Sequence, residues 1–111
     1  MLKLRNKEIH ISQGDDAAIS IALTQNGEPY TLQEGDEVIF TVGKDGTAAF
    51  TKRLSNAGET FVILIFDNQD TANMDFGFYQ YDLVMHCADG TQTTLVPPTL
   101  FEVMDVMTYG K

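Results

Sequence analysis

The chain has 111 residues and a formal charge of −9, from 16 Asp and Glu against 7 Lys and Arg. This length fits one domain, so we expect residues 1–111 to share a single core, and a hydrophobic content of 43% argues against disorder. The acidic balance argues against nucleic acid and anionic membrane surfaces as partners, because both need clustered Lys and Arg.

Taken in chain order, the first half predicts short strands separated by turns. The first three runs are Glu8 to Gln13, Ala17 to Thr24 and Glu37 to Val42. Apolar residues alternate with small or polar ones in the second run, which predicts one buried and one exposed face. The fourth run, Ala48 to Leu54, carries Lys52 and Arg53, and such charges favour the edge of a sheet because they discourage pairing with other chains.

The second half continues the pattern with one interruption. The fifth run, Thr60 to Phe66, is apolar on both faces, which predicts a central position or cover by another element. The polar segment Asp67 to Met74 is long enough for one helical turn. The sixth run is Phe78 to Cys87, with inward positions at Tyr79, Tyr81, Leu83, Met85 and Cys87. The last strand runs from Thr91 towards Met107 and contains Pro97-Pro98. This pair predicts a bulge, a kink or an edge because proline has no N–H to donate.

Three dipeptides mark tight turns between these runs, because each contains residues that tolerate positive φ: Asn26-Gly27, Asp45-Gly46 and Asp89-Gly90. The third lies between two strong strand signals and predicts an antiparallel hairpin. Seven short strands in a chain of this length predict an all-β fold, an antiparallel sandwich of about seven to eight strands.

The segment Asp75-Phe76-Gly77-Phe78-Tyr79-Gln80-Tyr81 sharpens the fold prediction. In immunoglobulin-type sandwiches a tyrosine near the start of the sixth strand donates a hydrogen bond to upstream backbone, two residues before a core position. Tyr79 fits this tyrosine corner, and Tyr81 fits the core position. The alternative is that Tyr79 is only an inward aromatic residue. The absence of Trp and of a second Cys excludes an antibody-type domain.

Candidate chemistry is sparse among the nucleophilic residues. His86 and Cys87 are neighbours on a predicted strand, so their side chains point to opposite faces and cannot form a dyad. A pairing of His10 with Cys87 in space stays open. We expect Cys87 to be a buried structural residue, and we expect no catalytic, cofactor-binding or metal-binding residues.

Acidic residues gather in two places. Asp67, Asp70 and Asp75 miss the spacing of a calcium loop, so we expect a solvated loop in which Asp67 or Asp70 caps a helical turn. A second set could hold a cation at an interface, although a solvated acidic rim is the preferred interpretation. Its members are Asp15, Asp16, Glu34, Asp36 and Glu37.

Five segments follow one another in a particular order and spacing: Ile11–Asp15, Gly27–Val42, Asp70-Thr71, Gly77–Leu83 and Thr94–Val103. Together they resemble the N-terminal domains of phage baseplate upper proteins. The resemblance covers residues 9–107 and implies an immunoglobulin-like sandwich in a tail or baseplate protein, which attaches host-recognition parts to the baseplate.

We therefore predict a phage or prophage virion protein, a baseplate or tail module that acts by protein–protein association and is not an enzyme. Its expected partners are other virion proteins or further copies of itself, without a cofactor. It has no apolar stretch typical of a signal peptide, so we expect synthesis in the bacterial cytoplasm and a final place in the virion. The alternative is a cell-surface module that binds carbohydrate or protein through exposed aromatics, for which Phe76, Phe78 and Tyr109 are the candidates.

The apolar fifth strand supports association independently. A sheet of a sandwich buries one face, so the second face of Phe61 to Phe66 needs a cover. This cover is either the segment Leu100 to Met107 of the same chain or a second subunit.

Overall fold

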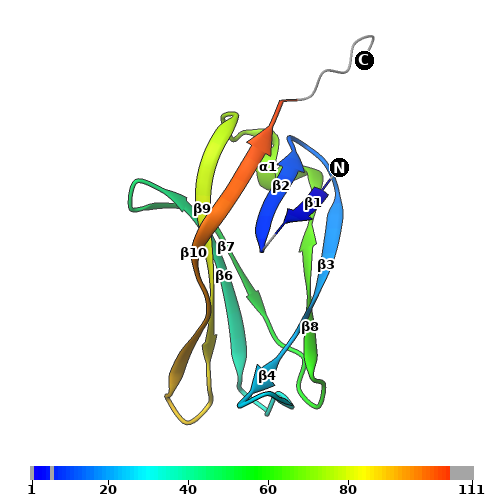
Figure 1. Cartoon of the computed structure of the whole chain (residues 1–111), viewed down its shortest axis with the longest axis vertical. Helices are drawn as coiled ribbons and strands as arrows, with labels where there is room; N and C mark the ends of the chain where they lie inside the picture. Colours follow the sequence, from blue (N-terminus) through cyan, green and yellow to red (C-terminus); the bar gives the residue numbers. More distant parts are fainter. Residues whose placement is uncertain (1, 6, 106–111) are drawn as a thin grey trace.

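Ten strand segments and one short helix form the part of the chain that the structure describes, residues 2–5 and 7–105 of a computed structural model (Figure 1). The mostly-β composition that the sequence predicts is confirmed. The elements are β1 (Leu2–Arg5), β2 (Glu8–Ser12), β3 (Ala17–Ala22), β4 (Thr24–Gln25), β5 (Glu28–Pro29), β6 (Glu37–Lys44), β7 (Thr47–Leu54), β8 (Phe61–Phe66), α1 (Asn68–Ala72), β9 (Gly77–His86) and β10 (Gln92–Met104).

Six of the strands form one sheet, here called the main sheet, in the order β1-β2-β10-β9-β6-β7. β7 lies at an edge, as its charges predict. The expectation of a wholly antiparallel architecture is wrong, because β2 runs parallel to β10, with Phe101 opposite Ile9 and Val103 opposite Ile11. The sheet is therefore mixed. β1 folds back antiparallel on β2 and had no counterpart among the predicted strands.

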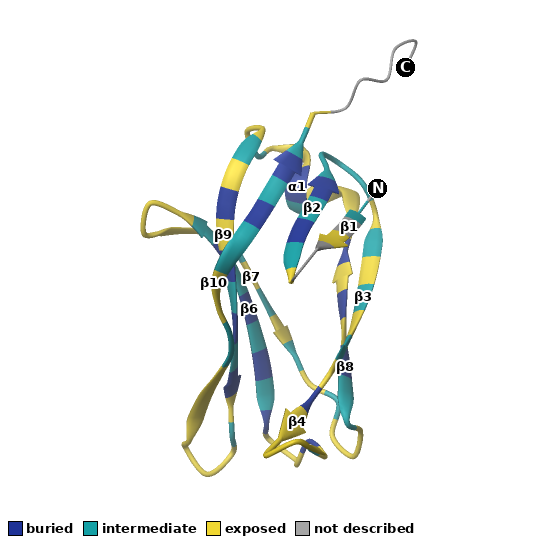
Figure 2. Ribbon diagram, viewed as in Figure 1, coloured by how far each residue is buried: buried dark blue, intermediate teal, exposed yellow. Residues whose placement is uncertain are grey.

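β3 and β8 form a separate two-stranded sheet, here called the small sheet, in which Ile19 lies opposite Leu64. Its inward side chains pack on the main sheet through an aromatic cluster: the rings of Phe40 and Phe66 are 5.6 Å apart, and those of Phe66 and Phe101 are 5.9 Å apart. Figure 2 shows the buried residues alternating with half-buried or exposed ones along the strands. Residues of both sheets contribute to one buried hydrophobic cluster.

The predicted turns form where the dipeptides stand. Asn26 and Gly27 join β4 to β5 with φ of 55° and 82°, and Asp45 and Gly46 join β6 to β7 with φ of 53° and 80°. Positive φ at both central residues matches the right-handed twist of the strands that such turns connect. The hairpin of β9 and β10 around Gly90 is also confirmed.

The proline pair interrupts β10 as predicted. The pairing of β10 with β9 shifts register between Thr94 and Val96 and again between Val96 and Thr99, a bulged stretch that includes Pro97 and Pro98. Beyond it, only Phe101 to Met104 of β10 pair with β2. The half of β10 that precedes the prolines therefore pairs with β9 alone.

The single short helix α1 connects β8 to β9 and begins with a capping box. The Asp67 carboxylate accepts a hydrogen bond from the Gln69 N–H at 2.8 Å, and the Asp70 carboxylate accepts one from the Asp67 N–H at 2.9 Å. Both interactions satisfy helix N–H groups that lack a partner within the helix. The predicted capping role of these two acids is confirmed.

β8 occupies a different place from the one predicted. It has one strand partner, β3, and its outer face is open: the Ile63 and Ile65 side chains are 48% and 58% exposed. The expectation of a central or covered strand is wrong. Leu100 to Met104 do not cover this face, because they belong to β10 in the main sheet. Residues 106 and 107 of the predicted covering segment lie outside the described residues.

Candidate functional site

The predicted tyrosine corner is present. Tyr79 is buried, and its hydroxyl donates a hydrogen bond of 2.9 Å to the carbonyl oxygen of Asp75, in the loop between α1 and β9. Tyr81 is also buried, and its hydroxyl donates to the Lys7 carbonyl, which ties β9 to the turn between β1 and β2. Burial raises the pKa of the Tyr81 hydroxyl. Both tyrosines therefore act as structural anchors.

The histidines and the cysteine do not come together. The His10 Nδ1 atom lies 2.7 Å from the Glu102 Oε1 atom on the neighbouring strand, and its other ring nitrogen is 3.4 Å from Glu8. His86 is exposed at the end of β9. Cys87 follows that strand and is half-buried, so its expected full burial is wrong. Its Sγ atom is 4.0 Å from the Tyr30 hydroxyl.

Asp36 departs most from the sequence expectation, because it is buried and not part of a solvated rim. Its Oδ2 atom accepts hydrogen bonds from the Tyr30 hydroxyl at 2.7 Å and from the Gln33 N–H at 2.9 Å. Its Oδ1 atom accepts one from the Ala88 N–H at 2.9 Å. One carboxylate thus connects the segment before β6 to the turn between β9 and β10.

These hydrogen bonds change the acidity of both partners. The bonds from the Gln33 N–H, the Tyr30 hydroxyl and the Ala88 N–H hold the pKa of Asp36 below its usual value, against the opposing effect of burial. The same carboxylate raises the pKa of the Tyr30 hydroxyl, and burial adds to that shift. Asp36 is therefore an ionised anchor whose acceptor atoms are all engaged within the chain.

The acidic residues that the sequence grouped lie at two ends of the molecule. Asp15 and Asp16 precede β3 at the α1 end, where the Gly14 N–H donates to the Thr71 hydroxyl. Glu34, Asp36 and Glu37 lie at the opposite end, beside the turn that joins β9 to β10 (Figure 1). Within residues 2–5 and 7–105, no group of three or more His, Cys, Asp or Glu residues is placed to hold a metal ion.

Two of the three candidate binding aromatics are open to solvent. Phe76 is 50% exposed in the loop before β9, and Phe78 is 64% exposed on the outer face of β9. Phe78 borders a shallow hollow of about 450 Å³ that also involves Lys44 and Leu100. The Lys44 ammonium lies 5.1 Å from the ring centre of Tyr79. Tyr109 lies outside the described residues.

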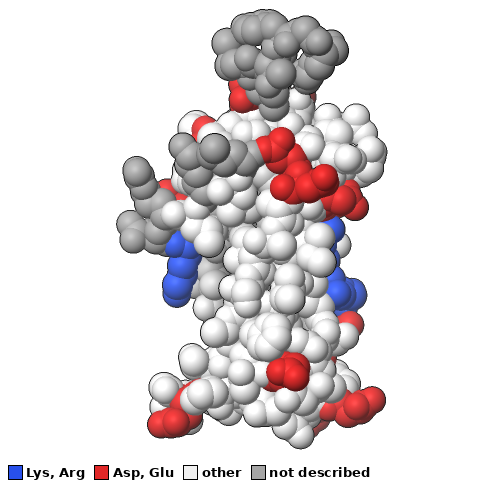
Figure 3. Space-filling view, turned by 90° about the vertical axis from the view of Figure 1, so that its right-hand side faces the viewer, with Lys and Arg blue, Asp and Glu red and all other residues white. Residues whose placement is uncertain are grey.

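An uncharged surface lies on the outer face of the small sheet, here called the β3–β8 face. Neither strand contains a charged residue. Figure 3 looks onto this side of the molecule and shows an uncharged area at its middle, with acidic side chains towards both ends. The face consists of three cross-strand pairs, Ala18 with Ile65, Ser20 with Ile63 and Ala22 with Phe61.

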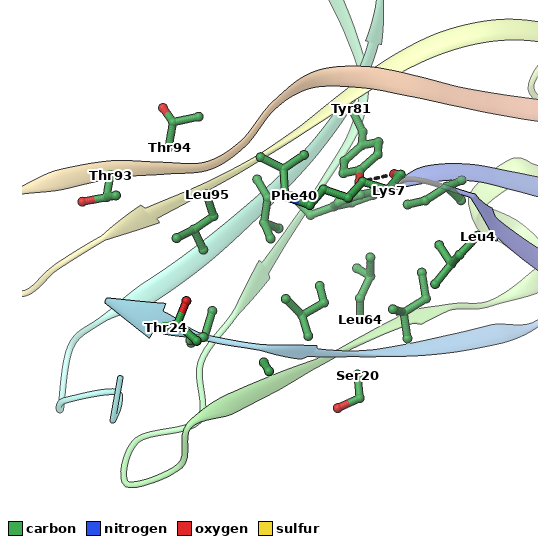
Figure 4. Close-up of a pocket in the computed structure, with 17 residues that line it drawn as sticks. Leu4, Lys7, Ser20, Thr24, Phe40, Leu64, Tyr81, Thr93, Thr94 and Leu95 are labelled. Atoms are coloured by element: carbon green, nitrogen blue, oxygen red, sulfur yellow. Dashed lines mark hydrogen bonds between the residues drawn. The ribbon is translucent and has the colours of Figure 1, made fainter. Parts of the chain in front are cut away.

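A groove opens beside the same sheet, between β3 and the part of β10 that precedes the prolines. It has a volume of about 480 Å³ and a mainly apolar lining. In Figure 4, Leu64 of the small sheet and Phe40 and Leu95 of the main sheet project into it from opposite sides. The inward Ile19 and Ile21 of β3 are only half-buried, whereas Leu64 of β8 is fully buried. The core is therefore incompletely covered on the β3 side.

No family model, curated protein or solved structure matches this chain. None of the described helices has the length and hydrophobicity to span a membrane. The arrangement of the described residues thus has to support any functional assignment by itself. Two surfaces stand out, the β3–β8 face with its adjoining groove and the exposed phenylalanines at the start of β9.

Proposed function

We propose that the chain is an immunoglobulin-like β-sandwich that serves as a structural module of a phage or prophage virion, in the baseplate or tail, and acts by protein–protein association. The order of its strands supports the fold. In variable-type immunoglobulin domains strands B and E share one sheet, while G, F, C and C′ share the other. The small sheet corresponds to B and E, and the run β10-β9-β6-β7 corresponds to G, F, C and C′.

The tyrosine corner supports the same assignment. In that family the tyrosine lies near the start of strand F and bonds to backbone a few residues upstream. Tyr79 is the third residue of β9, the counterpart of strand F, and donates to Asp75 four residues earlier. A β-rich chain needs neither this strand order nor this tyrosine hydrogen bond. Their joint presence therefore supports the immunoglobulin-like assignment.

The observation that carries the association role is the β3–β8 face. Ile63 and Ile65 expose about half of their side chains in a chain with a net charge of −9. Exposed apolar areas that are free of charge are typical of protein interaction sites, because burying them from water is favourable. Among the described residues, no catalytic groups are clustered at a surface in this way. The buried Asp36 carboxylate and the hydroxyls of Tyr79 and Tyr81 make hydrogen bonds that stabilise the fold.

The protein content of virions tests this proposal. Mass spectrometry of tail-containing particles from the source cell is expected to detect the chain in a fixed ratio to tail proteins, and tail or tape-measure genes are expected beside its gene. An Ile65→Lys chain supplied in place of the original should be lost from the particles. Thr51→Lys, at an exposed position of β7 in the main sheet, is the matched control and should be retained. Absence of the original chain from purified particles would overturn the proposal.

A second candidate function, a module that binds carbohydrate at a cell surface, is favoured by Phe76 and Phe78. Exposed aromatic rings suit the apolar faces of sugar rings, and the hollow beside Phe78 adds the polar Lys44. A glycan array separates the two functions. Binding that Phe76→Ala and Phe78→Ala both abolish, with Ile65→Lys unaffected, would favour the carbohydrate-binding module.

A further inference from the structure

The strand β2 shows how an extended segment packs along the open side of β10. It runs parallel to the last residues of β10, with Phe101 opposite Ile9 and Val103 opposite Ile11, and both isoleucines are buried. β2 therefore supplies backbone hydrogen bonds to the strand beside it and two alternating apolar side chains to the core. The pairing begins at Phe101, so the half of β10 that precedes the prolines has no strand on this side among the described residues.

The groove continues from the point where β2 begins. Figure 4 shows Leu4 and Lys7, which precede β2, at one end of the groove, and Thr24 and Thr93 at the other. Among the described residues that line it, Lys7 alone is charged. The groove therefore extends the place of β2 along the same side of the molecule, with a mainly apolar and nearly uncharged lining.

One rim of the groove is the open edge of β3, whose free backbone groups follow from the register. The Leu23 N–H donates to the Thr60 carbonyl, and the register continues without a shift from this pair through β3 and β8. Opposed residues in an antiparallel ladder alternate between bonded and non-bonded pairs. The backbone groups that face the open edge thus belong to Ala18, Ser20 and Ala22. Figure 4 shows the Ser20 side chain pointing away from the groove.

The other rim is the half of β10 that precedes the prolines. The Cys87 N–H donates to the Thr91 carbonyl, and the same register continues to Thr94. By the same alternation, the backbone groups of Thr93 face β9, while those of Gln92 and Thr94 face away from it. Backbone donors and acceptors thus line both rims. A further polypeptide strand satisfies such groups, whereas a purely apolar molecule leaves them unpaired.

The outer edge of β8 is also uncharged, but packed side chains adjoin it. The rings of Phe50 and Phe66 are 6.4 Å apart, and the Lys52 ammonium lies 2.8 Å from the Asp70 carboxylate. These contacts connect β7 to β8 and to α1. The inward side chains of an added strand would meet this packed contact beside β8, whereas beside β3 they enter the groove.

From these observations we infer that the groove binds an extended segment of a different protein, which pairs with the open edge of β3 and places an apolar side chain into the groove at every second position. This inference rests on the proposed association role and names the kind of partner. Strand addition of this type gains affinity from main-chain hydrogen bonds and specificity from the places that receive alternate side chains. A second copy of this chain is disfavoured as the partner, because each copy carries a charge of −9.

The length of the open edge determines the length of the bound segment. Six residues, the length of β3, extend over about 20 Å and direct three side chains to one face. These side chains would contact Ile19 and Ile21, which are only half-buried, and Leu95 across the groove. The bound segment would then use its apolar residues as β2 uses Ile9 and Ile11.

A peptide titration followed by NMR tests the strand site on the isolated chain. The probe is acetyl-Lys-Val-Thr-Val-Thr-Val-Thr-Lys-amide, whose three valines share one face of a strand. The matched control peptide contains the same residues in the order Lys-Val-Val-Thr-Thr-Thr-Val-Lys, in which no face carries three valines. In about 150 mM NaCl we expect saturable shifts at Ile19, Ile21 and Leu95, with a dissociation constant on the order of 100 µM for the probe and at least about tenfold weaker binding of the control.

Two variants test the backbone pairing. Ser20→Pro removes an N–H that faces the open edge and no bond to β8, so it should weaken binding of the probe by at least about tenfold. Ser20→Thr keeps this N–H and should bind like the original chain. Hydrogen exchange in the original chain keeps the test valid even if Ser20→Pro does not fold: saturating probe should slow the amides of Ala18, Ser20 and Ala22 several-fold and leave exposed amides of β7 unchanged.

Four outcomes would overturn the strand site. They are the absence of saturable binding up to about 1 mM, equal affinities for the two peptides, binding that Ser20→Pro leaves unchanged, and shifts confined to Ile63 and Ile65. The third outcome would mean that the groove takes apolar side chains without strand pairing, and the fourth that contact occurs through the β3–β8 face. A chain that does not bind the probe but is present in virions would refute the strand site and leave the virion role intact. A chain that binds the probe but is absent from virions would do the reverse.

Discussion

Replacing Asp36 by Asn tests the buried carboxylate that connects two distant parts of the chain. The substitution keeps the size of the side chain but exchanges one acceptor oxygen for an NH2 donor. The carboxylate accepts three hydrogen bonds, two of them from the backbone N–H groups of Gln33 and Ala88. The Tyr30 hydroxyl can rotate to accept from the new NH2 group, whereas a backbone N–H cannot.

One backbone N–H therefore loses its acceptor in the Asp36→Asn variant. An unsatisfied buried donor costs about 1–3 kcal/mol, and the remaining bonds lose the contribution of the negative charge. We expect the variant to be less stable by about 2–4 kcal/mol at pH 7. Glu34→Gln is the matched control, an exposed acid in the same segment, and should change stability by no more than about 0.5 kcal/mol.

The pH dependence of the free energy of unfolding distinguishes the original chain from the variant more sharply. The pKa of Asp36 is lower in the folded chain than the value of about 3.9 that an unfolded Asp has. Its stabilising contribution is therefore complete well above pH 4 and is lost as the pH falls through the folded-state pKa. The free energies of unfolding of the original chain and the variant should be measured with urea at pH 7 and at about pH 3. The difference between them should be smaller at the lower pH. An equal difference at both values, or a variant as stable as the original at pH 7, would refute the assigned role of the carboxylate.

Three further predictions concern the corner, a crowded glycine and metal binding. Tyr79→Phe should lower the free energy of unfolding by about 1 kcal/mol in urea titrations, since it removes the hydrogen bond to Asp75, and an unchanged value would argue against the corner. Gly43→Ala should cost about 1–3 kcal/mol by the same measurement, because its Cβ would lie 2.8 Å from the Thr47 carbonyl oxygen; Ala49→Ser, exposed on the same hairpin, should be neutral. Millimolar calcium should leave the melting temperature unchanged, because the acids of the described residues do not converge; a rise of many degrees would contradict this.

Much of the local structure could be predicted from the sequence because it depends on near neighbours. Alternation of side chains assigned the inward residues of β9, and the Asn-Gly and Asp-Gly pairs marked hairpins through their tolerance of positive φ. The capping role of Asp67 and Asp70 follows from spacing within one helical turn. Tyr79 was predictable because its acceptor lies only four residues away.

Contacts between distant segments depended on the tertiary structure. Asp36 looked like a surface acid, yet the Ala88 N–H, 52 residues later in the chain, completes its site and makes burial of the charge tolerable. The parallel pairing of β2 with β10 has no local signal, because alternation determines which face a residue occupies and not which strand lies beside it. The apolar β8 implied a covering partner, but only the assembled sheets show that no described part of the chain supplies one.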